Sequence, residues 1–512
     1  MAEPWLLAVD LGTGGPKVAA VSAGGEILAH AARRVDTCYT PDGGATQDPE
    51  TWWAGIRGAV EEILHAGVDG AEVTGVGITG QWGSTVPVDA AGRAAGPCLL
   101  WADTRGGKYS APVIGGRLSV MGYGPGNLLR WMRLTGGAPS PHGADPTGHA
   151  LQLQREHPEV YARTATLMEP LDYLGLRFTG RRAATPASMI LSWLTDNRPG
   201  RPPAYAATLV RHARRDAARL PELVPTGTVL GDVLPEVAAE LGLRPVPVVA
   251  GLPDLHTGYV GSGATAPLAG HVAISSTAWI GCAVPFKRTD LIHQLASVPG
   301  ARPGEYLVAN NHETAGLCLQ WLRDNVLGGG EDYATLTSVA AAAPAGAGGV
   351  MFTPWLNGER SPVDDRNLRA AFLNLSLTTD RSSLVRAVME GVAFNARWLL
   401  DAVEKFIRRP MPVLRILGGG AESALWCQAH ADILNRRVEQ VSEPTLANLR
   451  GAALYAASAL GQVAFDDIAR LIPVAAVYEP DPANRSTYES MYREYARVYG
   501  RLRPIYARLN GR

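Results

Sequence analysis

The stretch WLLAVDLGTGGPKVAAV, residues 5–21, decides the topology with which the chain begins. An apolar run, Trp5 to Asp10, is followed by a glycine-rich turn and by a second apolar run, Val18 to Val21. Gly24-Gly25 then forms a tight turn into Ile27 to Ala31. These runs predict a β-hairpin. A Rossmann or Walker phosphate site needs a helix after its glycine-rich turn, so the hairpin argues against both.

Beyond the hairpin, apolar runs typical of strands alternate with segments of helical periodicity, which favours an α/β architecture. Asp48 to Ala66 is predicted to be a helix because its large apolar residues recur every four positions. Ser383 to Phe406 has the same periodicity over a longer span. Strands are predicted at Val73 to Thr79 and at Met411 to Leu417. A docking helix is predicted at Ser486 to Arg503, and Pro504 should end or kink it.

The pattern restarts near residue 246, after a proline-rich segment. Val246 to Gly251 predicts another strand, and His271 to Ile280 predicts a second hairpin-like unit. Because 512 residues are too many for one ordinary core, we divide the chain into two domains, residues 1–245 and 246–512. The halves share no sequence repeat, but we expect them to be similar in structure.

Composition excludes several classes of protein. The formal charge is −1, from 47 basic and 48 acidic residues, so no basic excess points to a nucleic acid or an anionic membrane as partner. The five cysteines are far apart and form no Cys-x-x-Cys pair, which indicates reduced thiols in a cytoplasmic protein. No secretory signal is expected, because the N-terminus has neither a basic region nor a long hydrophobic stretch. A soluble enzyme or binding protein remains.

Three turns rich in glycine or hydroxyl residues are suited to hold phosphate. Asp10 to Lys17 places a carboxylate at a strand end, where it can hold Mg²⁺ through water while Thr13 faces phosphate oxygens. Ser275-Ser276-Thr277 follows a predicted strand, and Gly418 to Ser423 joins a strand to a helix, where a backbone can pass close to a nucleotide. Each also has an ordinary structural explanation, as a hairpin turn, a Ser/Thr-rich turn or a tight connection.

Two further motifs suit a polyol and its activation. Asp254, which follows a predicted strand, can accept the proton of an attacking hydroxyl, although it could equally cap a helix. Gln81 to Thr85 and Trp101 to Arg105 combine aromatic faces with Gln, Asp and Arg, a usual way to bind hydroxyl groups. A core Trp beside a surface salt bridge would explain these two stretches as well. The order and spacing of all five signals favour function.

In this order the stretches resemble the FGGY carbohydrate kinases of the actin/hexokinase-like ATPase superfamily, and most closely their xylulokinase-like branch. The resemblance runs over nearly the whole chain. In the first half it rests on Asp10 to Lys17, Ile78 to Asp89, Leu99 to Arg105 and Glu169 to Leu174. In the second half it rests on Gly358 to Pro362, Arg386 to Phe394 and Gly418 to Leu425.

The resemblance implies two ribonuclease-H-like domains flanking a central cleft, with the sugar bound mainly by the first and ATP by the second. It implies an ATP-dependent kinase of a pentulose such as xylulose, with Asp254 as general base and Asp10 placing Mg²⁺. Dimers are common among similar kinases, so the resemblance leaves a homodimer open without fixing the oligomeric state. The residues implied to contact ATP are Thr13, Lys17, Ser276, Thr277, Gly419, Gly420 and Ser423. Those implied to contact the sugar are Gln81, Trp82, Asp103, Arg105 and Asp254.

The chain departs from the xylulokinase pattern in the sugar region. Xylulokinases usually carry Gln-Met-His-Gly where this chain has Gln81 to Ser84, and Asp-Asn where it has Asp254-Leu255. The polar groups missing from these two motifs would touch the sugar, and their loss favours a less polar or differently shaped polyol. Two alternatives stay open: a glycerol or ribulose kinase, and a nucleotide-dependent binding or regulatory protein that keeps the fold with weak turnover.

Overall fold

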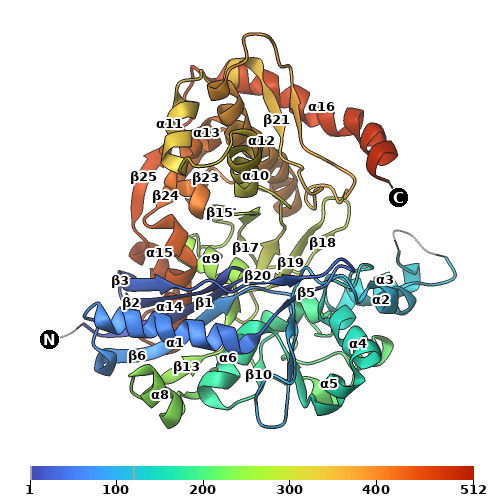
Figure 1. The fold of residues 1–512 in the computed structure, drawn as a ribbon, viewed down its shortest axis with the longest axis vertical. Helices are drawn as coiled ribbons and strands as arrows, with labels where there is room; N and C mark the ends of the chain where they lie inside the picture. Colours follow the sequence, from blue (N-terminus) through green and yellow to red (C-terminus); the bar gives the residue numbers. More distant parts are fainter. Residues whose placement is uncertain (1–2, 119–121, 512) are drawn as a thin grey trace.

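The computed structural model describes residues 3–118 and 122–511. Two halves, each built around an open sheet, lie one above the other in Figure 1, with the N-terminal half below. The first sheet has the order β12-β13-β6-β1-β2-β3, and β14 also pairs with β6. Its strands are β1 (Trp5–Gly12), β2 (Gly15–Ser22), β3 (Ile27–Ala32), β6 (Val73–Gly80), β12 (Val229–Asp232), β13 (Pro247–Val249) and β14 (Leu252–Pro253).

The second sheet repeats the topology of the first. In each sheet the opening strand pairs antiparallel with the next strand and parallel with a strand far along the chain: β1 with β2 and β6, and β15 with β16 and β23. The two predicted hairpins and the expected similarity of the halves are thereby confirmed. The order of the second sheet is β16-β15-β23-β24-β25. Its strands are β15 (Gly270–Ile274), β16 (Ala278–Gly281), β23 (Val413–Leu417), β24 (Arg437–Val441) and β25 (Val474–Tyr478).

Helices cover both faces of the first sheet. α1 (Pro49–His65) begins after Asp48, whose carboxylate accepts the N–H of Glu50 at 3.0 Å, and it buries Trp52 against one face. α14 (Ala447–Ala459), from far along the chain, packs on the other face against β1 and β6. The C-terminal half therefore supplies part of the core of the N-terminal half.

Glycines allow α14 to lie in close contact with both the first sheet and α9 (Asp254–Ser262). A Cβ on Gly77 of β6 would lie 2.3 Å from a carbonyl oxygen of α14, and one on Gly261 of α9 would lie 1.8 Å from another. A side chain at either position would push the layers apart, because both contacts are with backbone. Asp254 is the first residue of α9, so this packing sets the position of the predicted base.

The first sheet continues past the predicted boundary at residues 245 and 246. β13 and β14 both run parallel to β6 and pair with it, so the chain leaves the first sheet after Pro253. Together with the packing of α14, this pairing interlocks the two halves. The division into domains 1–245 and 246–512 stays a prediction.

The long helix predicted in the C-terminal half is confirmed. α12 (Arg381–Ile407) begins after Asp380, whose carboxylate accepts the N–H of Ser383 at 2.8 Å. Its apolar face packs with α13 (Ala424–Leu434) and with β16, within one large hydrophobic core.

The C-terminal helix docks on α12 and α13, as predicted. α16 (Arg485–Asn510) nevertheless continues through Pro504, where the sequence predicted an end or a kink. Tyr506 is buried beyond the proline, and the amide of Asn510 donates to the carbonyl of Asn367 at 2.9 Å. These tertiary contacts hold the last turn despite the missing N–H of the proline.

The remaining elements surround the two sheets. The other helices are α2 (Gly107–Ile114), α3 (Pro125–Leu134), α4 (Pro146–Glu156), α5 (Pro158–Arg163), α6 (Pro170–Thr179), α7 (Ala207–His212), α8 (Pro235–Leu241), α10 (Gly316–Trp321), α11 (Tyr333–Ala341) and α15 (Ile468–Leu471). Smaller sheets contain β4 (Cys38–Tyr39), β5 (Ala45–Gln47), β7 (Val86–Val88), β8 (Cys98–Leu99), β9 (Thr166–Met168), β10 (Ala183–Ala184), β11 (Glu222–Leu223), β17 (Ala283–Val284), β18 (Thr289–Asp290), β19 (Leu295–Pro299), β20 (Tyr306–Ala309), β21 (Met351–Thr353) and β22 (Ala371–Leu373).

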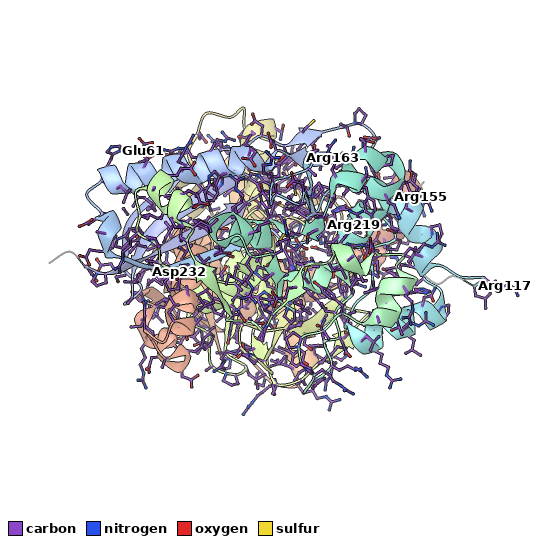
Figure 2. All side chains as sticks on the ribbon, turned by 90° about the horizontal axis from the view of Figure 1, so that it is seen from below. Glu61, Arg117, Arg155, Arg163, Arg219 and Asp232 are labelled. Carbon is purple, nitrogen blue, oxygen red and sulfur yellow. The ribbon has the colours of Figure 1, made fainter. Side chains whose placement is uncertain are left out.

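Helices α2 to α5 of the N-terminal half lie to one side of the first sheet (Figure 1). Figure 2, seen from below, places Glu61 of α1 and Asp232 of β12 on one side, and Arg155, Arg163 and Arg219 on the other. Within the described ranges, no helix combines the length and apolarity that a membrane crossing requires.

Candidate active site

Acidic and hydroxyl side chains gather at one edge of the first sheet. Asp10 lies near the end of β1, opposite Lys17 of β2 and in register with Thr79 of β6. Its side chain is buried, at 7% exposure. Burial raises the pKa of Asp10, and the charge of Lys17 partly opposes that shift. A bound cation would offset the burial of this carboxylate.

The second acidic residue, Asp254, lies at the same sheet edge. β14 runs parallel to β6, so that Leu252 and Pro253 pair with Thr79 and Gly80. The next residue, Asp254, begins α9, and its Oδ1 accepts the N–H of Leu255 at 2.7 Å. Since β1, β6 and β14 are parallel, their carboxyl ends meet at one edge.

The two carboxyls interact. The pKa of Asp254 is raised to about 7, first by burial and then by the charge of Asp10. A hydrogen bond of 2.7 Å between the buried hydroxyls of Thr79 and Thr257 ties β6 to α9 beneath them. A carboxyl that titrates near neutral pH can accept the proton of an attacking hydroxyl and release it afterwards.

The two predicted phosphate turns of the C-terminal half touch each other. Gly418 follows β23 with φ of +90°, and a Cβ on it would lie 2.5 Å from the carbonyl oxygen of Ile274, the last residue of β15. Ser276 is exposed and Thr277 is half-buried in the turn between β15 and β16. Both turns therefore lie at the end of the second sheet, as Asp10 and Thr13 lie at the end of the first.

The glycine turn after β23 has an open and a packed position. A Cβ on Gly419 would meet nothing within 4 Å, whereas one on Gly420 would lie 2.4 Å from the Ile274 side chain. Ser423 caps α13, since its hydroxyl accepts the N–H of Trp426 at 3.2 Å. Gly419 thus borders open space, while Gly420 and Ser423 serve the local fold.

The first sugar motif presents one free polar end. Gln81, at 3% exposure, receives the hydroxyls of Thr13 and Ser84 on Oε1, each at 3.5 Å. Among the described residues its Nε2 has no hydrogen-bond partner. A buried donor without a partner is destabilising unless a ligand satisfies it. Gln81 therefore fits the role of a contact to a substrate hydroxyl.

Trp82 is held against α9. Its indole N–H donates to the carbonyl of Ser188 at 2.9 Å, and its ring meets His256 edge-on at 5.7 Å between centroids. Burial lowers the pKa of His256 to about 4, so this ring is neutral at pH 7. With its donor engaged, Trp82 offers a neighbouring ligand an aromatic surface.

Asp103 and Arg105 are paired with each other. The guanidinium of Arg105 donates to Asp103 at 2.5 Å, and the N–H of Ala45 donates to the same carboxylate at 3.1 Å. Asp103 is fully buried. This pair fixes the loop before β5 to the segment that carries Trp101.

Three residues hold the site through contacts to Thr13, Gly83 and Ser84 that the sequence did not predict. The amide of Gln47 donates to the carbonyl of Thr13 at 2.7 Å, and the indole N–H of Trp101 donates to the Thr13 hydroxyl at 3.1 Å. The carboxylate of Glu169 accepts the N–H groups of Gly83 and Ser84 at 3.1 and 3.0 Å, and burial raises its pKa well above the usual range. Trp101 and Glu169 stand in motifs quoted above, but spacing alone does not reveal what they contact.

The donor set at the sheet edge fits a magnesium ion. Among residues 3–118 and 122–511, no three His, Cys, Asp or Glu side chains cluster to form a closed metal site. Mg²⁺ needs one or two carboxylates, because it keeps several waters and binds substrate phosphates. Asp10 supplies such a carboxylate, and Asp254 lies at the same sheet edge.

Two surface cavities lie away from these residues. One, of about 400 Å³, is lined by Arg409, Arg415 and Glu439, and the other, of about 550 Å³, by Arg93, Arg177 and Arg182. Neither includes a predicted site residue. The gathering of interacting carboxyls at the end of the first sheet is the stronger guide to the active site.

This arrangement of two similar halves, with acids at one sheet end and small turns at the other, defines a phosphotransferase of the actin-like ATPase fold. Residues 5–111 match the N-terminal domain of the FGGY family of carbohydrate kinases, and residues 285–460 match its C-terminal domain. The two matches cover more than half of the chain. The chain therefore belongs to the FGGY family, and it is a carbohydrate kinase with ATP as a substrate.

Relatives extend this similarity over the whole length. Xylulose kinase of Staphylococcus epidermidis is 28% identical, over 99% of both chains, and that of Escherichia coli is 27% identical, over 98% of this chain and 100% of the relative. The crystal structure of a "xyloylose kinase" from Brucella ovis has a TM-score of 0.86 at 26% identity, covering 98% of this chain and 100% of that one. The predicted family, fold class and enzyme class are confirmed.

Proposed function

We propose that the chain transfers the γ-phosphoryl group of MgATP to a hydroxyl of a pentulose such as xylulose. One observation carries the proposal: Asp254 begins α9 at the sheet edge where Asp10 lies near the end of β1, and the two carboxyls interact. The relatives named xylulose kinases, 27–28% identical over almost the full length, support a pentulose as the acceptor.

Asp254 acts as the general base. Its carboxylate accepts the proton of the substrate hydroxyl as that oxygen approaches the γ-phosphorus in line with the bridging oxygen. Its pKa of about 7 leaves much of the base deprotonated at physiological pH. Mg²⁺, when bound, neutralises part of the phosphate charge. Asp10, with Asp254 nearby, would hold this ion.

The phosphate groups lie between the two sheet ends. Thr13 and Lys17 bind them from the first hairpin, and Ser276 and Thr277 bind them from the second. The open position at Gly419 lets the adenosine pass close to the backbone. Gly420 and Ser423 act indirectly, since one packs the turn on β15 and the other fixes the start of α13.

The sugar binds on the side of Gln81 and Trp82. Nε2 of Gln81 donates to a hydroxyl of the sugar, and the ring of Trp82 packs against the carbon atoms of the sugar. Asp103 and Arg105 serve the sugar site by fixing its loop. Since Gly83 and Leu255 stand where xylulokinases usually carry His and Asn, the preferred substrate is less polar or differently shaped than D-xylulose. We further propose that the protein is a homodimer and lies in the cytoplasm.

A coupled ADP-release assay with MgATP and a panel of pentuloses, hexuloses, pentitols and glycerol tests this function. We expect turnover with one pentulose or close relative, absent in Asp254→Ala while ATP still binds by calorimetry. Asp232→Asn, at the exposed end of β12, is the matched control. Phosphoryl transfer retained by Asp254→Ala would refute the assignment of Asp254 as the base. The absence of ADP release with every compound of the panel would refute the proposed substrate class.

A further inference from the structure

A charged residue on the loop between β21 and β22 reaches the N-terminal half. The guanidinium of Arg360 lies over the ring of Trp101, 5.7 Å from its centroid, and forms an ion pair with Glu313. Arg360 and Glu313 lie within residues 285–460, whereas Trp101 lies within 5–111. The contact therefore joins the two matched domains.

Other charges of the same loop confirm that it faces the N-terminal half. Burial lowers the pKa of His142, and the nearby charges of Arg366 and Asp364 act on it in opposite directions. The loop that carries Arg360 therefore also brings charges near His142, in the N-terminal half.

On one side the contact is anchored in the C-terminal core. The buried carboxylate of Glu359 accepts the N–H groups of Glu313 and Arg360 at 2.8 and 2.9 Å. Its other oxygen accepts the amide of Asn395, on α12, at 2.6 Å. The backbone of Arg360 is therefore fixed, while its side chain is partly exposed, at 38%, and pairs with Glu313.

On the other side the contact leads to the predicted ligands of both substrates. The indole N–H of Trp101 donates to the hydroxyl of Thr13 at 3.1 Å, and its backbone N–H donates to Ser84 Oγ at 3.0 Å. Both hydroxyls lie 3.5 Å from Gln81 Oε1. Trp101 thus orients a phosphate ligand and a sugar ligand together.

We propose that Arg360 is a positioning residue for phosphoryl transfer: by packing on Trp101 it aligns Thr13 and Gln81 when the two halves come together. The inference rests on the proposed function of these two residues. A cation over an aromatic ring at a partly exposed site is a weak contact. It therefore acts on the alignment of bound substrates and has little effect on the fold.

Steady-state kinetics of Arg360→Met test the proposal. We expect kcat for the sugar to fall about tenfold while KM for ATP changes less than about twofold, because misalignment of reacting groups affects turnover before binding. Arg360→Lys keeps a cation over the ring and should recover most of the loss. Arg381→Met is the control, since Arg381 pairs with Glu331 within the C-terminal half. An Arg360→Met variant as active as this control would overturn the proposal.

A double-mutant cycle with Trp101→Leu asks whether the two side chains act together. If Arg360 works through Trp101, removing both should lower kcat by no more than Trp101→Leu alone. Losses that multiply would show that Arg360 acts by another route and would overturn the proposal.

Hydrogen exchange separates this proposal from the sugar assignment, because it needs no turnover. In Arg360→Met, amides of residues 11–17 and 99–105 should exchange faster than in wild type, with the melting temperature unchanged. Faster exchange without activity on any sugar would support the contact and refute only the proposed substrate. Unchanged exchange in both segments would overturn the contact.

Discussion

The two hairpins that open the two sheets have the same topology and different chemistry. Near its turn the first hairpin pairs Asp10 with Lys17, whereas the second ends by pairing Ile274 with Ala278. The first thus brings charge to the sheet edge, and the second brings backbone N–H groups and hydroxyls. A repeated fold does not repeat its site, because side chains near a turn change without disturbing the strand pairing.

The difference predicts that the first hairpin is the more sensitive of the two. Asp10→Asn should lower kcat by on the order of 10²-fold and raise the Mg²⁺ concentration needed for half-maximal rate, because the carboxylate that would hold the cation is lost. A Mg²⁺ titration of the coupled assay measures both effects. An unchanged titration would assign the metal to other ligands.

The glycine turn offers a contrast between two adjacent positions. Gly418→Ala should destabilise the protein by about 1–3 kcal/mol, because φ is +90° and the new Cβ would meet backbone. Gly419→Ala, with open space around it, should leave the melting temperature unchanged and raise KM for ATP. Equal melting temperatures for the two variants would contradict the packing of Gly418 on β15.

The interaction of the two carboxyls predicts a pH dependence. Because the base must be deprotonated, kcat/KM should fall about tenfold per pH unit below the Asp254 pKa of about 7. The charge of Asp10 raises that pKa, so the residual activity of Asp10→Asn should have its acidic limb at lower pH. If wild type and Asp10→Asn lost activity over the same acidic pH range, a group other than Asp254 would set the pH dependence.

The smallest effect is expected in the second hairpin. Ser276→Ala should raise KM for ATP about threefold with kcat nearly unchanged, since the backbone donors of the turn remain. Thr13→Ala is the comparison, and it should be the more harmful because Thr13 also contacts Gln81. A loss with Ser276→Ala as large as that with Asp10→Asn would end the distinction between the hairpins.

Much of the fold could be predicted from local pattern. The hairpin at residues 5–21, the helix after Asp48 and the long helix α12 follow from apolar periodicity and capping, which act over a few residues. Pro504 shows the limit of such rules, because tertiary contacts of Tyr506 continue the helix past it.

The candidate site could be predicted in part. Asp10 lies near the end of β1 and Asp254 directly follows β14, so their meeting at one edge follows once these strands both run parallel to β6. The pairing of Asp103 with Arg105 and the capping by Ser423 could not be distinguished from ligand contacts, because a polar side chain in a sequence carries no sign of its partner.

By itself the sequence determined the family, the two hairpins and the residue types available for phosphoryl transfer, since these depend on local order and spacing. Tertiary structure alone decided that α14 covers the first sheet, that Thr13 is held by Gln47 and Trp101, and that Arg360 reaches across the halves. Such contacts join residues far apart in the chain, and the packing of the whole core sets their geometry.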